Sequence, residues 1–140
     1  MKHQKIGRKF SREKKQREAM LKIMLGDLFI KRKMKTTLAK AKELKMIAEK
    51  MIGQMKNPQS LRLLKSRLPR NITPAIIRDL AAKTASRNSG YLRVLKCGAR
   101  KSDSAQIAII EIIEDKNNES KSAKGGSQPK ADQPLAGAKK

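Results

Sequence analysis

The sequence predicts an α+β fold in which four helices pack against a small β-sheet. From about residue 11 to residue 85, apolar residues recur at intervals of three and four, which is the period of an amphipathic helix. After residue 90 the pattern changes to short β-branched runs bounded by glycines. A length of 140 residues suits one modest domain with a single core.

The first helix is expected from about Ser11 to Ile30, with Ser11 as its N-cap. Its apolar residues follow the helical period at Leu21, Met24, Leu25, Leu28 and Phe29. The next segment, KRKMKTT, ends in two threonines, which disfavour a helix interior because branching at Cβ restricts their rotamers. This segment is therefore predicted to be a short strand or an extended link.

The second helix has the clearest pattern in the chain, and Thr37 is its expected N-cap. One apolar stripe runs along it, formed by Ala41, Leu44, Ile47, Ala48, Met51, Ile52 and Met55. Two shorter helices follow, each introduced by a cap residue and a proline, at Asn57–Pro58 and at Thr73–Pro74. The third should end at Pro69 and the fourth near Ala85. Their expected core residues are Leu61, Leu64 and Leu68 in the third helix and Ile77, Leu80 and Ala81 in the fourth.

Two strands are predicted after the helices. YLRVLKC lies between Gly90 and Gly98, and QIAIIEII is a dense β-branched run, so an antiparallel hairpin joined by GARKSDSA is expected. Such a pair needs a helical layer over one face. In the second strand the even-numbered residues Ala108, Ile110 and Ile112 should face the core. Cys97 is expected to pack as a small buried hydrophobe.

The charge of the chain is its strongest functional signal. Lys and Arg number 35 against 12 Asp and Glu, which gives a net charge of +23 and a pI near 10.7. Such a surface attracts polyanions, so nucleic acid is the expected partner. Residues 1–10 form a basic arm with little apolar surface, expected to be mobile in isolation. Residues 115–140 have the composition of a disordered polar tail, which leaves residues 1–114 as the single domain.

Several classes of protein are excluded by composition. With one cysteine and one histidine, the chain has neither an internal disulfide framework nor a Cys/His zinc cluster, and a reducing compartment is expected. No nucleophile and base are held together, so no catalytic residue, metal, cofactor or small-molecule substrate is expected. No apolar run reaches the roughly 18 to 20 residues of a membrane span, and a cytoplasmic protein is expected.

Aromatic residues are scarce, which indicates how nucleic acid would be recognised. Phe10, Phe29 and Tyr91 are too few for a base-stacking platform, so phosphates, 2′-hydroxyls and shape should be read instead. Two other interpretations of the basic residues remain open: a solvated charge run without function, and a Lys-rich helix lying on a membrane. The membrane interpretation is disfavoured because all four apolar helix faces are needed for one core.

Four stretches carry a resemblance to a known family: MKHQKIGR, TTLAKAKEL, ASRNSGYLRVLKCGAR and AQIAIIEII. Over residues 1–114 the chain resembles the bacterial large-ribosomal-subunit protein seventeen family. It departs from the family pattern at Ala39, where proline is common, and at Ser89, where glycine is common. The resemblance implies a third strand near residues 33–37, so that four helices in two layers would pack on a small mixed sheet.

The resemblance also implies a function. It implies a structural ribosomal protein that binds large-subunit rRNA near the peptide exit tunnel, beside neighbouring large-subunit proteins, in the cytoplasmic ribosome. It assigns Lys2, His3, Gly7 and Arg8 to an arm that enters rRNA. The alternative is a ribosome assembly or compaction factor that binds nucleic acid transiently. Further cations are expected to bind RNA because of their charge. With these included, the predicted RNA-binding residues are Lys2, His3, Lys5, Gly7, Arg8, Lys9, Arg12, Lys14, Lys15, Arg17, Arg32, Lys35, Arg87, Arg93, Lys96 and Arg100.

Overall fold

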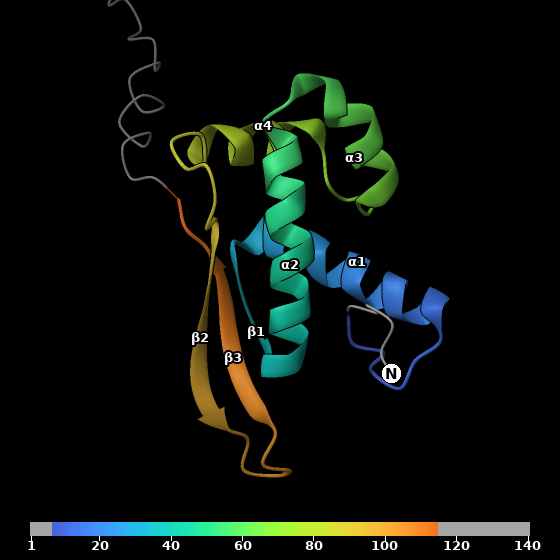
Figure 1. Ribbon diagram of the computed structural model, residues 1–140, viewed down its shortest axis with the longest axis vertical. Coiled ribbons are helices and arrows are strands. Elements are labelled where there is room, and N and C mark those ends of the chain that lie inside the picture. Colours follow the sequence, from blue (N-terminus) through green and yellow to red (C-terminus); the bar gives the residue numbers. More distant parts are fainter. Residues whose placement is uncertain (1–6, 115–140) are drawn as a thin grey trace, which may run out of the picture.

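A computed structural model describes residues 7–114, and these residues form four α-helices, one 3-10 helix and three strands (Figure 1). The predicted α+β class is confirmed. The predictions for residues 1–6 of the arm and for the tail at 115–140 lie outside the described residues. In chain order the elements are α1 (Lys14–Lys31), β1 (Lys33–Thr37), α2 (Leu38–Met55), η1 (Pro58–Ser60), α3 (Leu61–Arg67), α4 (Pro74–Lys83), β2 (Leu92–Ala99) and β3 (Gln106–Ile112).

The three strands form an antiparallel sheet in the order β1-β3-β2. The KRKMKTT segment supplies β1, in which Met34 pairs with Ile110 and Thr36 with Ala108. The expectation of a mixed sheet was wrong, because β1 and β2 run in the same direction but lie at opposite edges, separated by β3. Each adjacent pair in the sheet is therefore antiparallel.

The core lies between α2 and one face of the sheet. Ala108, Ile110 and Ile112 are buried, which confirms the predicted register of β3. The α2 stripe is buried except for Ile47, which is half-buried. In Figure 1 α2 runs alongside the sheet, α4 lies beyond the end of the sheet that is opposite the hairpin loop, and the far end of the β2–β3 hairpin projects past the first residues of α2. The remaining buried helical side chains come from α1, α3 and α4: Leu25, Leu28, Phe29, Leu64, Ile77 and Leu80.

Helix starts were predicted well in two of the three longer helices. Thr37 and Thr73 are the N-cap residues of α2 and α4. Ser11 does not cap α1, which begins after Glu13. Phe10 and Ser11 both have positive φ, so the backbone turns sharply before the helix and the Ser11 hydroxyl is out of position. Leu61 and Ala81, expected in the core, are only partly buried.

Cys97 is exposed, in contrast to the buried position predicted for it. From Leu95 onward every residue of β2 is exposed, because this end of the hairpin extends beyond the helical layer (Figure 1). The pairing of β2 with β3 is also irregular between Lys96 and Ala99, where Gly98 has a φ of +83°. The bulge therefore interrupts the regular pairing in the exposed part of β2, which the helical layer does not cover.

A close contact between α1 and the α3–α4 connection depends on Gly26. This residue is buried, and a Cβ atom added to it would lie 2.5 Å from Cγ of Pro69. The proline ring is closed onto its own backbone, and the preceding residue, Leu68, is buried, so the ring has little room to move. Gly53 of α2 offers a contrast, since a Cβ there would meet nothing within 4 Å.

We predict that Gly26→Ala and Gly53→Ala change stability in opposite directions. Alanine favours a helix interior over glycine by up to about 1 kcal/mol, and Gly53→Ala should gain part of this. Gly26→Ala should lower the free energy of unfolding by about 1–3 kcal/mol, because overpacking outweighs helix propensity. Urea denaturation followed by circular dichroism measures both changes. A stabilising effect of both substitutions would contradict the close contact.

Candidate nucleic-acid interface

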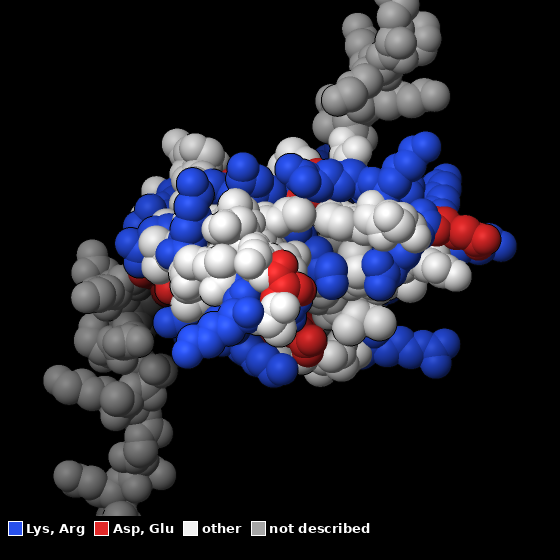
Figure 2. Space-filling view, turned by 90° about the horizontal axis from the view of Figure 1, so that it is seen from below, with Lys and Arg blue, Asp and Glu red and all other residues white. Residues whose placement is uncertain are grey.

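The predicted RNA-binding residues fall into separate places on the structure. Lys2, His3 and Lys5 lie outside the described residues. One described group, the N-terminal cationic segment, comprises Gly7, Arg8, Lys9, Arg12, Lys14, Lys15 and Arg17. A second group, the sheet-end cations, comprises Lys35, Lys96 and Arg100. Figure 2 views the molecule from below Figure 1 and shows Lys and Arg around most of the outline, with few Asp and Glu.

The N-terminal cationic segment is exposed except for Arg17, which is half-buried. Nε of Arg8 lies 3.9 Å from a carboxylate oxygen of Glu43 in α2, a distance that allows only a weak ion pair. The guanidinium of Arg12 donates a hydrogen bond to the carbonyl of Phe10 at 3.2 Å. Gly7 has a φ of +105°, which favours glycine at this position. The segment thus presents its cations to solvent, with one loose contact to α2.

Two of the sheet-end cations, Lys35 and Arg100, line a cavity of about 480 Å³ that we call the hairpin cavity, and Lys96 is not part of this lining. It lies between β1, the first turn of α2 and the far end of the β2–β3 hairpin. Its lining includes a further cation, Lys40, which was not among the predicted residues. A lysine near the start of a helix is common and does not by itself indicate a binding site. Only the fold shows which residues lie beside it. The lining residues are Lys35, Thr36, Thr37, Lys40, Cys97, Ala99, Arg100 and Ile107.

Arg100 is held in place by Asp103 within the hairpin loop. Nε and Nη2 of Arg100 donate hydrogen bonds to the Asp103 carboxylate at 2.8 and 2.7 Å. The backbone N–H of Ala105 also donates to this carboxylate, at 3.2 Å. The hydrogen bonds from Arg100 are the main reason why the pKa of Asp103 lies below its ordinary value. Both groups are therefore charged at neutral pH.

Arg93 and Arg87 occupy different surroundings. Arg93 lies on the sheet face opposite the helices, where its Nη2 approaches a carboxylate oxygen of Glu111 to 2.6 Å across β2 and β3. Its Nε donates a hydrogen bond to the same oxygen at 2.8 Å. Arg87 is half-buried in the connection between α4 and β2, and its carbonyl accepts a hydrogen bond from Nζ of Lys56. Neither of these two arginines lines the hairpin cavity described above.

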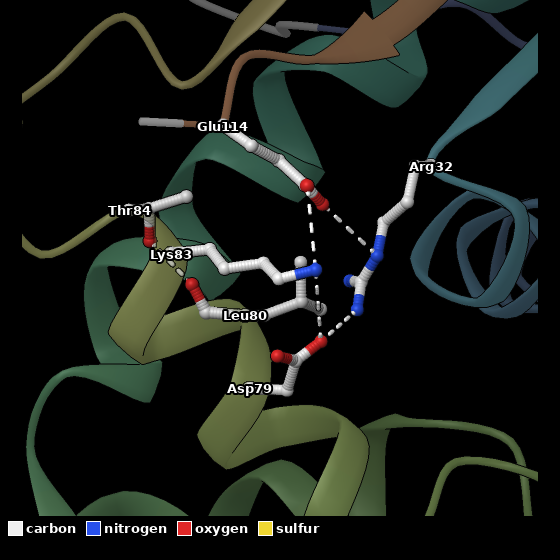
Figure 3. A network of polar contacts seen from close by, with 6 residues as sticks. All are labelled: Arg32, Asp79, Leu80, Lys83, Thr84 and Glu114. Carbon is white, nitrogen blue, oxygen red and sulfur yellow. Dashed lines mark hydrogen bonds and ion pairs between the residues drawn. The ribbon is translucent and has the colours of Figure 1, made fainter. Parts of the chain in front are cut away.

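Arg32 belongs to an ion-pair network within the protein (Figure 3). Its Nη2 lies 2.5 Å from Asp79 of α4, and its Nε lies 3.2 Å from Glu114 after β3. Nζ of Lys83 completes the network at 3.7 Å from Asp79 and 3.4 Å from Glu114. The side chain of Arg32 is 25% exposed. The network therefore joins the end of α1 to α4 and to the chain after the last strand.

The Arg32 backbone also has a special role. It caps α1 with a φ of +62°, its N–H donates to the carbonyl of Leu28, and its carbonyl accepts from the N–H of Ile112. A left-handed conformation costs a non-glycine residue roughly 1 kcal/mol or more. The ion pairs of the side chain help to offset that cost. The structure thus gives this predicted RNA-binding residue an evident role in the fold.

A family model described as ribosomal protein L17 matches residues 20–113, which is more than half of the chain. The matched range includes the sheet-end cations and leaves out the N-terminal cationic segment. Within residues 7–114, no helix is long and apolar enough to cross a membrane, and no three His, Cys, Asp or Glu side chains are grouped to hold a metal ion.

We predict that Arg32→Met lowers the free energy of unfolding by about 1–2 kcal/mol, because Lys83 would then be the one cation left to Asp79 and Glu114 within residues 7–114. Lys31→Met is the control: it removes one positive charge and an exposed pair with Asp27, in which nitrogen and oxygen are 3.8 Å apart. The control should change stability by less than about 0.5 kcal/mol. Equal effects of the two substitutions in urea denaturation would mean that the network does not stabilise the fold.

Proposed function

The chain belongs to the ribosomal protein L17 family, and we propose that it is a structural component of the large ribosomal subunit that binds and stabilises folded rRNA. The family match carries this proposal. The net charge of +23 supports it, since folded RNA brings phosphates close together and needs cations between them. Neighbouring large-subunit proteins are the other proposed partners. No catalytic step, cofactor or small-molecule substrate is part of the proposed role.

The geometry favours recognition of the RNA backbone over stacking on bases. Phe29 and Tyr91 are buried, and Phe10 is half-buried. Nζ of Lys56 lies 4.8 Å from the centre of the Tyr91 ring, and the Tyr91 hydroxyl donates to the carbonyl of Asn88 at 2.8 Å. This ring is therefore engaged inside the protein. Exposed lysines and arginines are left to bind phosphates, and arginine can bind them in a two-pronged geometry.

Sedimentation through a gradient, at low and at high salt concentration, tests this proposal. A tagged copy of the protein should comigrate with the large subunit at both low and high salt, because an integral component is held by many contacts at once. A transient assembly or compaction factor, the alternative interpretation of the sequence, would be released into free fractions at high salt. Release at high salt would therefore overturn the structural role.

We predict that the basic arm contributes to rRNA affinity without contributing to stability. Replacing Lys2, Lys5, Arg8 and Lys9 with Gln should weaken rRNA binding and make the dependence of log K on log salt shallower, by up to roughly 0.7 to 0.9 for each phosphate that is no longer bound. The melting of the isolated protein should change little, since Arg8 and Lys9 are exposed. Titration against large-subunit rRNA at several salt concentrations measures the slope.

A matched variant controls for the removed charge in this experiment. Replacing the exposed residues Arg62, Lys65, Arg67 and Arg78 of α3 and α4 with Gln removes the same total charge from another surface. It should reduce the affinity and the slope less than the arm variant does. If the two variants lose affinity equally, only the net charge matters, and the arm makes no specific contacts.

A further inference from the structure

The hairpin cavity combines three cations with hydroxyl groups, and Asp103, which binds one of these cations, Arg100, is not in its lining. Lys35 comes from β1, Lys40 from α2 and Arg100 from the hairpin loop, so segments far apart in the sequence supply the charges. Thr36 and Thr37 add hydroxyl groups, and none of the described lining residues is acidic. Asp103 offsets one of these three charges, and the repulsion that remains costs free energy unless an anion binds in the cavity.

The first turn of α2 adds to the positive potential of the cavity. The N-terminus of an 18-residue helix carries a partial positive charge, and this first turn holds no acidic residue. Thr37 is the N-cap residue, yet among the described residues its side chain makes no capping hydrogen bond. Its hydroxyl is therefore not used as a cap, and it belongs to a residue that lines the cavity. These features strengthen a site whose charge comes from the three side chains.

The bulge in β2 completes the cavity. Between Lys96 and Ala99 the pairing with β3 shifts, and the positive φ of Gly98 turns the chain so that Ala99 pairs with Gln106. Arg100 follows directly, and Asp103 uses two of its five N–H groups. The other N–H groups can donate to an anion in the cavity. The loop thus fixes the guanidinium and leaves it able to bind.

We propose that the hairpin cavity binds the phosphate backbone of RNA, with Lys35, Lys40 and Arg100 as the cationic contacts. This proposal rests on the proposed function, which is rRNA binding, and names a surface through which the chain would bind rRNA. Threonine hydroxyls can bind either phosphate or a 2′-hydroxyl, and Ala99 and Ile107 offer apolar surface to a ribose. A second copy of this chain is a poor occupant, because its own large positive charge would be repelled.

Cys97 gives a direct test because it is the only cysteine in the chain, is exposed and lines the cavity. The rate of its alkylation by iodoacetamide should fall at least fivefold when the full chain is saturated with protein-free large-subunit rRNA. As a control, Cys97→Ser combined with Ala75→Cys moves the thiol to an exposed position on α4. Its alkylation should slow less than twofold in the same complex.

The results distinguish failure of this site from failure of the proposed function. Absence of rRNA binding would overturn both. Normal binding with unprotected Cys97, or with equal protection of both thiols, would overturn the hairpin cavity site alone. Protection in the assembled large subunit but not on protein-free rRNA would mean that a protein covers the cavity, which also overturns the RNA assignment.

A second measurement tests the charge. Lys35→Gln with Lys40→Gln should weaken rRNA binding by roughly 5- to 8-fold for each phosphate released at about 0.1 M salt, and should make the salt slope shallower by about 1.4 to 1.8 in total. The control pair, Lys50→Gln with Lys65→Gln, removes two lysines that do not line the cavity. Circular dichroism checks that both variants are folded. A loss of affinity no greater than that of the control pair would overturn the proposal.

Discussion

The packing of α2 against one face of the three-stranded sheet is the contact on which the rest of the structure depends. A sheet this small needs a covering layer to be stable, and α2 supplies it. Ala41 and Ala48 are fully buried on the helix, and Ala108 is fully buried on β3. Such small side chains let helix and sheet approach closely. The buried leucines and isoleucines beside them provide most of the apolar area removed from water.

This packing also determines which parts of the molecule stay exposed. Because Thr37 is both the last residue of β1 and the N-cap of α2, the helix turns back over the sheet immediately, and its first turn stays beside the end of the hairpin. The hairpin extends past that point (Figure 1). The hairpin cavity is formed in this corner. Its position is therefore a consequence of the way the core is covered, since no single element contains it.

The features that the sequence predicted well are those set by local pattern. The helical period of apolar residues and the N-cap residue predicted α2 with its buried stripe. The alternation of side chains along a strand predicted which face of β3 points to the core. The features that failed depend on distant parts of the chain. The residues of β2 do not indicate how far the helical layer extends along the strand. Cys97 lies beyond that layer, and so it was wrongly expected to be buried. A strand near residues 33–37 does not specify which partner it pairs with, and so the sheet was wrongly expected to be mixed.

The candidate site was predicted from charge, and charge alone does not distinguish a binding arginine from a structural one. Arg32, Arg93 and Arg100 look alike in the sequence, but their carboxylate partners differ. Arg32 contacts Asp79 and Glu114 and is partly buried, whereas Arg93 and Arg100 are exposed and contact Glu111 and Asp103. Asp79, which pairs with Arg32, lies 47 residues away in the sequence. Lys40 was missed for the same reason, because its place in the lining of the hairpin cavity depends on neighbours from other elements.

The distribution of acidic residues explains how so basic a chain can fold and still keep most of its cations exposed to solvent. Asp79, Glu111 and Glu114 each contact an arginine that joins two or more elements, so the few negative charges stabilise the fold where it is assembled. The remaining cations repel one another across the surface, and salt screens this repulsion over about 10 Å at 0.1 M. A bound RNA would remove it more completely. Because a ligand that binds only the folded state stabilises that state, rRNA binding and folding of this domain are expected to be thermodynamically coupled.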